Sequence, residues 1–367
     1  MTSPKLELIG LRKDYGDGTV AAVDGIDLVV EAGETVALLG PSGCGKSTTL
    51  NMIVGLEHPT AGDIRIDGRS VVGVPAGRRN VGLVFQDYAV FTHMTVRKNL
   101  AFGLDVRGVD RRTAARRVDE VADLLGLTAL LDEKASRLGG SQLQRVAIGR
   151  TLVVQPAVLL LDEPLSNLES ESRQAMRREL RRLQADIGLT IIYVTHDQIE
   201  ALSLASKIAV MSSGKIVQFD RTERVYDRPS HIFVAGFMGS PPMNLVRGEM
   251  AGARFKRDGF GVTLPSGFAA KARADERQVT LGIRPEQLRL VSEGEGSLSG
   301  RVSLVQPRGP EAVVTVETGG VTLQALVAAT QQPDEGAAVG LAFDTAALML
   351  FSGETGCSVP DVSEVAQ

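Results

Sequence analysis

The stretch GPSGCGKST, residues 40–48, decides the fold of this chain. It fits the pattern G-x-x-x-x-G-K-[ST] completely, with both glycines, the lysine and the serine at their fixed positions. The apolar run ETVALLG (34–40) precedes it and predicts a buried strand, and residues 47–55 after it predict a helix. A glycine-rich loop between a strand and a helix is the context that a phosphate-binding P-loop requires. The sequence therefore predicts an α/β P-loop fold.

The composition of this loop suits a ligand with several negative charges. Its glycines let backbone N–H groups close around phosphate oxygens, and the helix that follows adds partial positive charge. We expect Lys46 to reach the β- and γ-phosphates and the Ser47 hydroxyl to bind Mg²⁺. The loop therefore predicts binding of a nucleoside triphosphate together with Mg²⁺.

Three further motifs place polar residues after apolar runs. In LLLDEP (159–164), Asp162 could hold Mg²⁺ through water, and Glu163 could polarise the attacking water. His196 follows another buried strand in YVTHD, and we favour a γ-phosphate contact over a purely structural role. Gln86, in VFQDY, lies at the same predicted edge of the sheet. The residues alone leave open whether Gln86 belongs to the site or is structural.

The chain divides into two predicted domains. Near-continuous apolar strands alternate with helices over residues 1–236, which predicts a mainly parallel, helix-covered sheet. Residues 88–155 lack strand patterns and predict a helical insert, with an amphipathic helix over 111–125. The arginines of that helix could form a docking patch, although a solvated face is the simpler interpretation. From 237 to 367, short β-type runs separated by turn residues predict a small all-β domain.

Composition and charge exclude several classes of protein. The 367 residues carry a net charge of −4, unlike a basic nucleic-acid-binding protein, so no nucleic-acid partner is expected. Cys44 and Cys357 are the two cysteines, far apart in sequence, which suits a reducing cytoplasm. No apolar stretch approaches the roughly 20 residues that span a bilayer, and the first residues lack a secretory signal. We expect a soluble protein that reaches a membrane only through a partner.

Taken in order, the motifs resemble those of the ATPase subunit of ABC transporters. The resemblance runs along nearly the full chain and covers the P-loop, VFQDY, LGGSQLQRVAIGR, LLLDEPLSN and VTHD. It implies that Tyr15 stacks on the adenine of ATP, and that residues 167–169 form the D-loop. It assigns catalytic roles to Glu163, His196, Lys46 and Gln86, and Mg²⁺ binding to Ser47, Gln86 and Asp162. The nucleotide contacts it implies are Tyr15, Gly40, Pro41, Ser42, Gly43, Cys44, Gly45, Lys46, Ser47, Thr48, Gln86, Leu138, Gly139, Gly140, Ser141, Gln142, Asp162 and His196.

The same resemblance implies an assembly and a location. Two chains would form a homodimer that holds two ATP molecules head to tail, each between one chain's P-loop and the other chain's signature, the segment LGGSQ at residues 138–142. Two polytopic permease subunits and an extracytoplasmic solute-binding protein would complete an importer. The chain would then lie peripherally on the cytoplasmic face of the plasma membrane.

The second half of the chain narrows the type of transporter. YDRPSHIFVAGFMGSPPMN, GIRPEQL and LMLFSGETG resemble the maltose/multiple-sugar importer ATPases, whose C-terminal regulatory β-domain has an oligonucleotide-binding-like fold. Import of a glycerol phosphodiester or a polyamine is the alternative within transport. Outside transport, two alternatives are a slow nucleotide-sensing regulator and a soluble ABC ATPase that acts on ribosomes or DNA. The chain has one P-loop and no heptad repeat, which disfavours the soluble ABC ATPase.

The signature departs from the family pattern LSGGQ. Residues 138–142 read LGGSQ, so Gly139 stands where serine is usual and Ser141 replaces a glycine. In the family that serine contacts the γ-phosphate of the partner's ATP, and loss of one such donor costs about 10²–10³ in rate. Because the catalytic residues are retained, we expect a slow but real ATPase.

Overall fold

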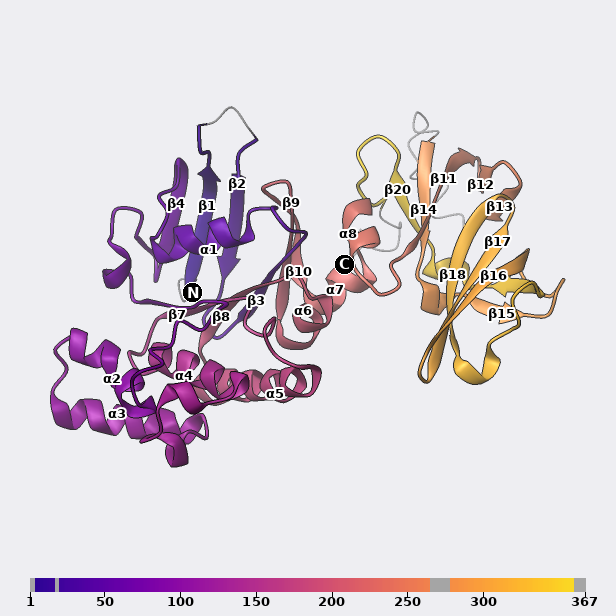
Figure 1. Ribbon diagram of the computed structural model, residues 1–367. Coiled ribbons are helices and arrows are strands. Elements are labelled where there is room, and N and C mark those ends of the chain that lie inside the picture. The colour runs from indigo at the N-terminus through magenta and orange to yellow at the C-terminus, as the bar shows by residue number, and fades with distance from the viewer. Residues whose placement is uncertain (1–3, 17–19, 265–277, 360–367) are drawn as a thin grey trace. The chain divides into compact units, whose positions relative to one another are not determined.

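The structure, a computed structural model, describes residues 4–16, 20–264 and 278–359 (Figure 1). The chain separates into two compact units, residues 1–223 and 224–367. The sequence placed a domain boundary after residue 236, and that boundary stays a prediction. Each unit is described by itself below.

A six-stranded sheet forms the centre of the first unit, in the order β10-β9-β3-β8-β7-β6. Its strands are β3 (Thr35–Leu39), β6 (Val81–Val84), β7 (Val158–Asp162), β8 (Thr190–Thr195), β9 (Lys207–Ser212) and β10 (Lys215–Arg221). All neighbours pair in parallel except the hairpin of β9 and β10. The strands are near-continuously apolar because helices and a second sheet cover their faces. The predicted mainly parallel sheet is confirmed.

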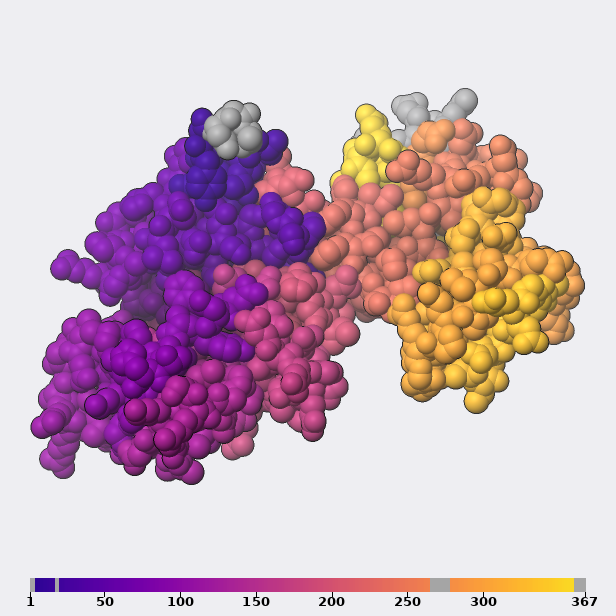
Figure 2. Space-filling model, viewed as in Figure 1, coloured from indigo at the N-terminus to yellow at the C-terminus, as the bar shows by residue number. Residues whose placement is uncertain are grey.

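Helices cover this sheet and form a separate lobe of the same unit. The helices on the sheet are α1 (Lys46–Val54), α5 (Ser170–Ile187) and α6 (Gln198–Leu204). Between β6 and β7 lie α2 (Val96–Val106), α3 (Arg111–Leu124) and α4 (Gly140–Leu152). Figure 2 shows the purple and magenta atoms of this intervening segment gathered below the indigo atoms of the N-terminal residues. No named strand lies between residues 85 and 157, all of which are described, so the predicted helical insert is confirmed.

An antiparallel sheet that the sequence analysis did not predict completes the first unit. It contains β1 (Leu6–Lys13), β2 (Val23–Val30), β4 (Ala61–Ile66) and β5 (Arg69–Ser70), in the order β2-β1-β4-β5. Leu6, Leu8 and Leu11 of β1 are buried in one core with Leu50 and Ile53 of α1. The sheet therefore packs on the P-loop helix and helps to fix its position.

The second unit begins with two short helices and is otherwise β-structure. After α7 (Thr222–Asp227), which starts in the first unit, and α8 (Ile232–Phe237), it forms two five-stranded sheets, ordered β13-β12-β11-β14-β20 and β15-β19-β16-β17-β18. All their described pairings are antiparallel. The strands are β11 (Asn244–Ala251), β12 (Arg254–Arg257), β13 (Phe260–Thr263), β14 (Gln278–Ile283), β15 (Arg289–Val291), β16 (Leu298–Arg308), β17 (Glu311–Thr318), β18 (Val321–Ala328), β19 (Ala338–Ala342) and β20 (Met349–Ser352). The predicted all-β region is confirmed.

Candidate functional site

The site lies at the carboxyl ends of four adjacent parallel strands. In the sheet order β3-β8-β7-β6, the P-loop follows β3 and His196 follows β8. Asp162 is the last residue of β7, and Gln86 follows β6 by two residues. Parallel strands end at a common edge, so residues from four distant parts of the sequence converge there.

Two glycines let the P-loop pass close to other backbone segments. A Cβ atom at Gly40 would lie 2.3 Å from the carbonyl oxygen of Met211, and one at Gly45 would lie 2.3 Å from that of Ala22. Gly45 also has a φ of 102°, a left-handed conformation that side chains disfavour. Only glycine fits at either position, which explains the two glycines of the motif.

The Lys46 side chain points into the loop. Its Nζ donates to the carbonyl oxygens of Gly40 and Pro41, at 2.8 and 2.9 Å, and lies 3.7 Å from the Cys44 sulfur. The lysine is 7% exposed, so its ammonium group is held inside the loop rather than in solvent. Cys44 is also buried.

Two oxygen donors could hold a cation beside this loop. The Asp162 carboxyl ends β7, and the exposed Ser47 lies in the first turn of α1. Burial raises the pKa of Asp162, the nearby Glu163 carboxylate raises it further, and Lys46 opposes both. Among the described residues, no group of three or more acidic, His or Cys side chains could form an all-protein metal site. One carboxylate and one hydroxyl fit Mg²⁺, which keeps water and phosphate oxygens as its other ligands.

Glu163 and His196 meet across the ends of β7 and β8. Glu163 Oε1 lies 3.1 Å from His196 Nδ1, and the Glu163 N–H donates to the Val194 carbonyl oxygen at 3.0 Å. Glu163 has a φ of 46°, which is uncommon outside glycine and is held here by contacts on both sides. The structure thus brings together two residues that the sequence proposed separately.

Gln86 is tied to the segment after Glu163. Its side-chain Nε2 donates to the Ser166 hydroxyl at 3.3 Å, and its main-chain oxygen accepts from Asn167 Nδ2 at 2.8 Å. These contacts leave the Gln86 side-chain oxygen as the atom that could face a cation. They also link the VFQDY segment to the predicted D-loop, residues 167–169.

The signature residues form the start of α4. Gly139 is its N-cap, and the Gly139 N–H donates to Gln142 Oε1 at 3.1 Å. Gly139 is extended, with φ −75° and ψ 166°, and a Cβ atom there would meet nothing within 4 Å. A serine would fit at this position without strain. In the described part of the chain, no hydrogen bond or ion pair joins residues 138–142 to the P-loop.

Tyr15 follows β1 by two residues. The residue is 56% exposed, and Lys13 Nζ lies 4.8 Å from its ring centroid. A ring that offers an exposed face beside a cation suits stacking on a base. Its role toward adenine stays a prediction.

The sequence analysis missed Gln144, which connects two parts of the site. Gln144 is fully buried in α4, and its Nε2 donates to the carbonyl oxygen of Pro164, the residue after Glu163. A buried amide needs a partner, so this bond fixes the helix α4 against the segment that contains Glu163. The available signal was a polar residue at an inward position of α4, between buried residues such as Val146 and Ile148.

In the residues that the structure describes, no helix is both long enough and apolar enough to cross a bilayer.

Comparison with known proteins places these features in a family. The family model described as "ABC transporter" matches residues 23–166, "MalK OB fold domain" matches 239–288, and "TOBE domain" matches 281–351. These matches follow the order of the P-loop unit and the β-rich unit.

Several curated relatives match along nearly the whole chain. The trehalose/maltose import ATP-binding protein MalK of Thermococcus litoralis is 42% identical over 375 residues, covering 96% of this chain and 99% of the relative. The xylose/arabinose import ATP-binding protein XacK of Haloferax volcanii is 41% identical, with 94% and 91% covered. An sn-glycerol-3-phosphate import ATP-binding protein of Rhizobium etli is 46% identical, with 86% and 87% covered.

A solved structure of another ABC transporter protein matches part of the chain. The cbiO1 protein of Clostridium perfringens, part of the ABC transporter complex cbiONQ, matches with a TM-score of 0.56 and 30% identity. The match covers 61% of this chain and 90% of that one. This chain therefore belongs to the family of ATP-binding subunits of ABC importers.

Proposed function

We propose that this ATPase uses Glu163 as its catalytic base, with His196 beside it, to energise import of a sugar. The observation that supports this assignment is the 3.1 Å contact between Glu163 Oε1 and His196 Nδ1, at the strand edge that carries the P-loop. A base and a partner within hydrogen-bond reach at a phosphate-binding edge can direct water to a γ-phosphate.

The P-loop and its neighbours would hold the nucleotide. Lys46 would exchange its bonds to the Gly40 and Pro41 carbonyls for bonds to phosphate oxygens, because a charge-assisted bond to phosphate is the stronger one. Ser47 and Asp162 would hold Mg²⁺, with Gln86 as a third contact. When bound, Mg²⁺ supplies charge neutralisation at the β- and γ-phosphates.

Glu163 and His196 would then do the proton chemistry. Glu163 accepts a proton from water as the water oxygen bonds to the γ-phosphorus. The bond from that phosphorus to the β–γ bridging oxygen breaks, so ADP leaves and inorganic phosphate forms. His196 fixes the orientation of the carboxylate and contacts the γ-phosphate. The backbone bond from Glu163 to Val194 holds this residue in its strained conformation, so its carboxylate is aimed before ATP binds.

A second copy of the chain would complete each site. The signature at residues 138–142 makes no bond to the P-loop of its own chain, which is consistent with a site shared head to tail between two copies. The N–H groups at the start of α4 remain as donors to the partner's γ-phosphate. Without a serine at Gly139, one hydroxyl donor is missing, so hydrolysis would be slow.

Permease subunits would bind near Gln86 and α2. Phe85, Phe102 and Val106 are 43%, 38% and 73% exposed, although all three are apolar. Tyr88 and Ala89, just after Gln86, both have positive φ values without being glycine, as segments that move at functional sites often do. A homodimer peripherally attached to two permeases on the cytoplasmic membrane face would explain both features.

A sugar is the transported solute we favour. Two of the relatives named above carry names for sugar import, of trehalose/maltose and of xylose/arabinose. A third is named for sn-glycerol-3-phosphate import, so a glycerol phosphodiester remains the first alternative, ahead of a polyamine. An extracytoplasmic solute-binding protein would deliver the solute, and that protein and the permeases would choose it.

Steady-state ATP hydrolysis by Glu163→Gln tests the assignment. We expect a loss of about 10²–10⁴ in rate, the usual size of a general-base contribution, with ATP binding retained. Glu171→Gln, an exposed carboxylate in the first turn of α5, is the matched control and should keep the wild-type rate. A Glu163→Gln rate equal to that of wild type would reject Glu163 as the base and favour a nucleotide-sensing regulator.

A further inference from the structure

Two residues connect β8 to α6, and His196 is the first of them. β8 ends at Thr195 and α6 begins at Gln198, so His196 and Asp197 form the whole connection. The His196 side chain is 60% exposed, and its ring nitrogen Nδ1 lies 3.1 Å from the Glu163 carboxylate. Because little of the ring is packed, its position depends on the backbone of this two-residue connection.

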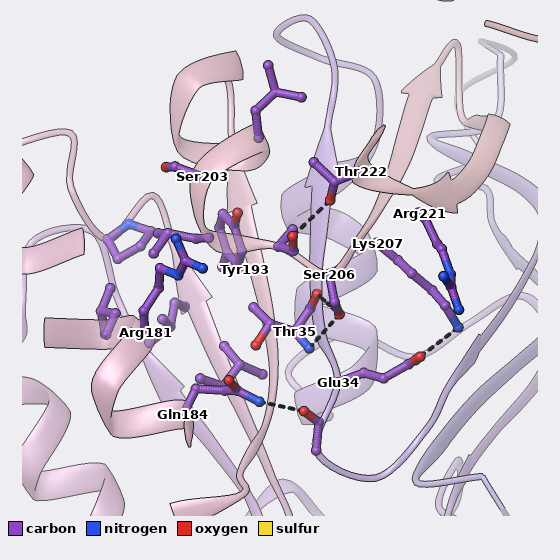
Figure 3. Close-up of a pocket in the computed structure, with 18 of the residues that line it drawn as sticks. Glu34, Thr35, Arg181, Gln184, Tyr193, Ser203, Ser206, Lys207, Arg221 and Thr222 are labelled. Atoms are coloured by element: carbon purple, nitrogen blue, oxygen red, sulfur yellow. Dashed lines mark hydrogen bonds and ion pairs between the residues drawn. The ribbon is translucent and has the colours of Figure 1, made fainter. Parts of the chain in front are cut away.

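Helix α6 gives this connection a fixed end. Tyr193 of β8 lines a pocket together with Ser203 of α6 (Figure 3), and its hydroxyl donates to the Glu200 carbonyl oxygen at 3.1 Å. The Thr195 hydroxyl donates to the buried Glu200 carboxylate at 2.8 Å. These two buried bonds hold α6 against β8, so the N-terminus of α6 is a firm support for the residue that caps it.

Asp197 is that capping residue, and both of its carboxylate oxygens have partners. Oδ1 accepts from the N–H groups of Ile199 and Glu200, at 2.8 and 3.2 Å. Oδ2 lies 3.6 Å from Nη1 of Arg173, which belongs to α5. The cap therefore joins the carboxylate to α6, and the ion pair joins it to a second helix.

Arg173 also contacts the predicted D-loop. Its Nη2 donates to the Leu168 carbonyl oxygen at 3.2 Å, and the Leu168 side chain is buried. A Cβ atom at Gly140, the first residue of α4, would lie 3.7 Å from Leu168 Cδ2, an ordinary packing distance. One guanidinium thus links Asp197 to the D-loop, which in turn lies against the start of α4.

The surroundings of Arg173 suit a bridge between segments better than a surface ion pair. The side chain is 32% exposed, and its Nε is buried without a hydrogen-bond partner in the described part of the chain. A buried donor without a partner lowers stability. The guanidinium leaves this donor unused while its two Nη groups contact two different segments, which its planar, forked shape allows.

We propose that Arg173 is a positioning residue that ties the His196 connection to the predicted D-loop and so holds His196 in contact with Glu163. The inference rests on the catalytic roles proposed above for Glu163 and His196. Arg173 acts through Asp197 and takes no part in the proton transfer.

Histidine NMR of the full-length, nucleotide-free chain tests the positioning without any ATP hydrolysis. The chain contains four histidines: His58, His93, His196 and His231. Labelling with ¹³Cε1-histidine gives one ring signal for each, and the signal that His196→Gln removes belongs to His196. The readout is the change in this signal caused by Glu163→Gln, because that change reports the contact between the two side chains.

The readout is compared in three backgrounds: wild type, Arg173→Ala and Arg182→Ala. Arg182 is the matched control, an arginine of the same helix that pairs with Asp186. We expect Glu163→Gln to move the His196 signal in wild type and in Arg182→Ala, and to move it less than half as far in Arg173→Ala. An equal change in all three backgrounds would overturn the proposal and leave the catalytic assignment in place. Absence of the change in wild type would reject the contact itself, and the inference with it.

Steady-state ATP hydrolysis supplies the second readout. Arg173→Ala should lower kcat about tenfold or more, because a misplacement of about 1 Å can cost about 10² in rate. The KM for ATP should stay within twofold of wild type, since the P-loop is unchanged. Arg182→Ala should keep the wild-type kcat. Equal kcat values for the two variants would overturn the proposal wherever His196→Gln is slow.

Asp197→Asn is the second variant, and it breaks the ion pair even where Arg173→Ala does not fold. Asparagine caps a helix as well as aspartate does, so α6 keeps its cap while the charge is lost. We expect the same fall in kcat as in Arg173→Ala, with no further fall when the two are combined. Additive losses would show that Arg173 does not act through Asp197 and would overturn the proposal. A weakened contact in Arg173→Ala with an unchanged kcat would support the positioning and reject the catalytic role of His196.

Discussion

At the scale of single residues, the candidate site contains side chains that are held by backbone strain, by hydrogen bonds or by burial. Glu163 has a left-handed backbone and is held by a main-chain bond to Val194, while the ammonium of Lys46 is enclosed by loop carbonyls. Asp162 is partly buried beside another carboxylate. We propose that the strain at Glu163 and the burial of Asp162 cost stability, and that they aim these groups at a phosphate or a cation.

Asp162→Asn should stabilise the nucleotide-free chain near neutral pH. The pKa of Asp162 is raised in the folded state, so the folded chain binds this proton more tightly than the unfolded chain does. Its contribution to stability is therefore lost as the pH rises through the raised pKa. An uncharged amide does not ionise, so the variant keeps the stability that wild type loses as Asp162 deprotonates. In thermal melts, the variant should therefore have a higher melting temperature than wild type at pH 7 and a similar one at acidic pH.

Binding of ATP should raise the melting temperature of the chain, and part of this increase should depend on Mg²⁺. The Asp162→Asn substitution should abolish that Mg²⁺-dependent part. Thermal melts with ATP, with and without Mg²⁺, would measure this. A variant that melts lower than wild type at neutral pH, or that keeps the full Mg²⁺ effect, would contradict the role given to Asp162.

Gly139→Ser combined with Ser141→Gly should raise turnover. The structure leaves open space at Gly139, and its extended backbone suits a serine at the N-cap. Replacing glycine by serine at an N-cap changes stability by only a few tenths of a kcal/mol. We therefore expect a turnover increase of about tenfold or more, as a restored γ-phosphate donor gives, with an almost unchanged melting temperature. An unchanged rate would show that the signature does not limit hydrolysis.

At the scale of elements, Arg79 anchors the P-loop helix. Its buried guanidinium donates to the Met52 and Ile53 carbonyl oxygens at the end of α1, at 2.7 and 3.1 Å. It also donates to the carbonyl oxygens of Val72 and Val74, at 3.2 and 2.7 Å. One cation thus satisfies several carbonyls, including those left open where the helix ends.

Arg79→Ala should lower the free energy of unfolding by about 2–3 kcal/mol, the cost of losing charged hydrogen bonds and leaving buried acceptors unpaired. Arg78→Ala, at the exposed neighbouring residue, should change it by less than about 0.5 kcal/mol. Chemical denaturation of both variants would measure the difference. Equal effects would show that Arg79 does not anchor α1.

Local patterns explain which elements could be predicted from the sequence. The strand that ends at Asp162, the P-loop and the helical insert each have a strong local signal, and the structure contains all three. The sheet of β1, β2, β4 and β5 was missed, because the P-loop segment separates β1 and β2 from β4 and β5, and only their pairing buries Leu6 and Leu8. Register and pairing are long-range properties that residue periodicity does not contain.

The same reasoning applies to the candidate site. Motifs identified Glu163 and His196 as separate candidates. The two residues are 33 positions apart in the sequence, so their contact became visible only in the folded chain. Gln144 and Arg79 were missed because their partners are backbone carbonyls, which carry no sequence signature.

At the scale of the whole molecule, the central claim is that each ATP is held by the P-loop of one copy and the signature of another. Within the described residues, the signature makes no bond to its own P-loop, and Gln144 links its helix to Pro164 in the same chain. A joint response of the two segments to nucleotide that grows with protein concentration would therefore come from a second copy. Such a joint response distinguishes a nucleotide site shared between two copies from a P-loop that binds ATP within one copy.

Hydrogen exchange of the Glu163→Gln chain with ATP and Mg²⁺ tests that claim most directly. The account predicts slower amide exchange at residues 40–48 and at residues 139–145, with both effects removed by adding Lys46→Ala. Protection confined to residues 40–48 at every protein concentration would contradict the account.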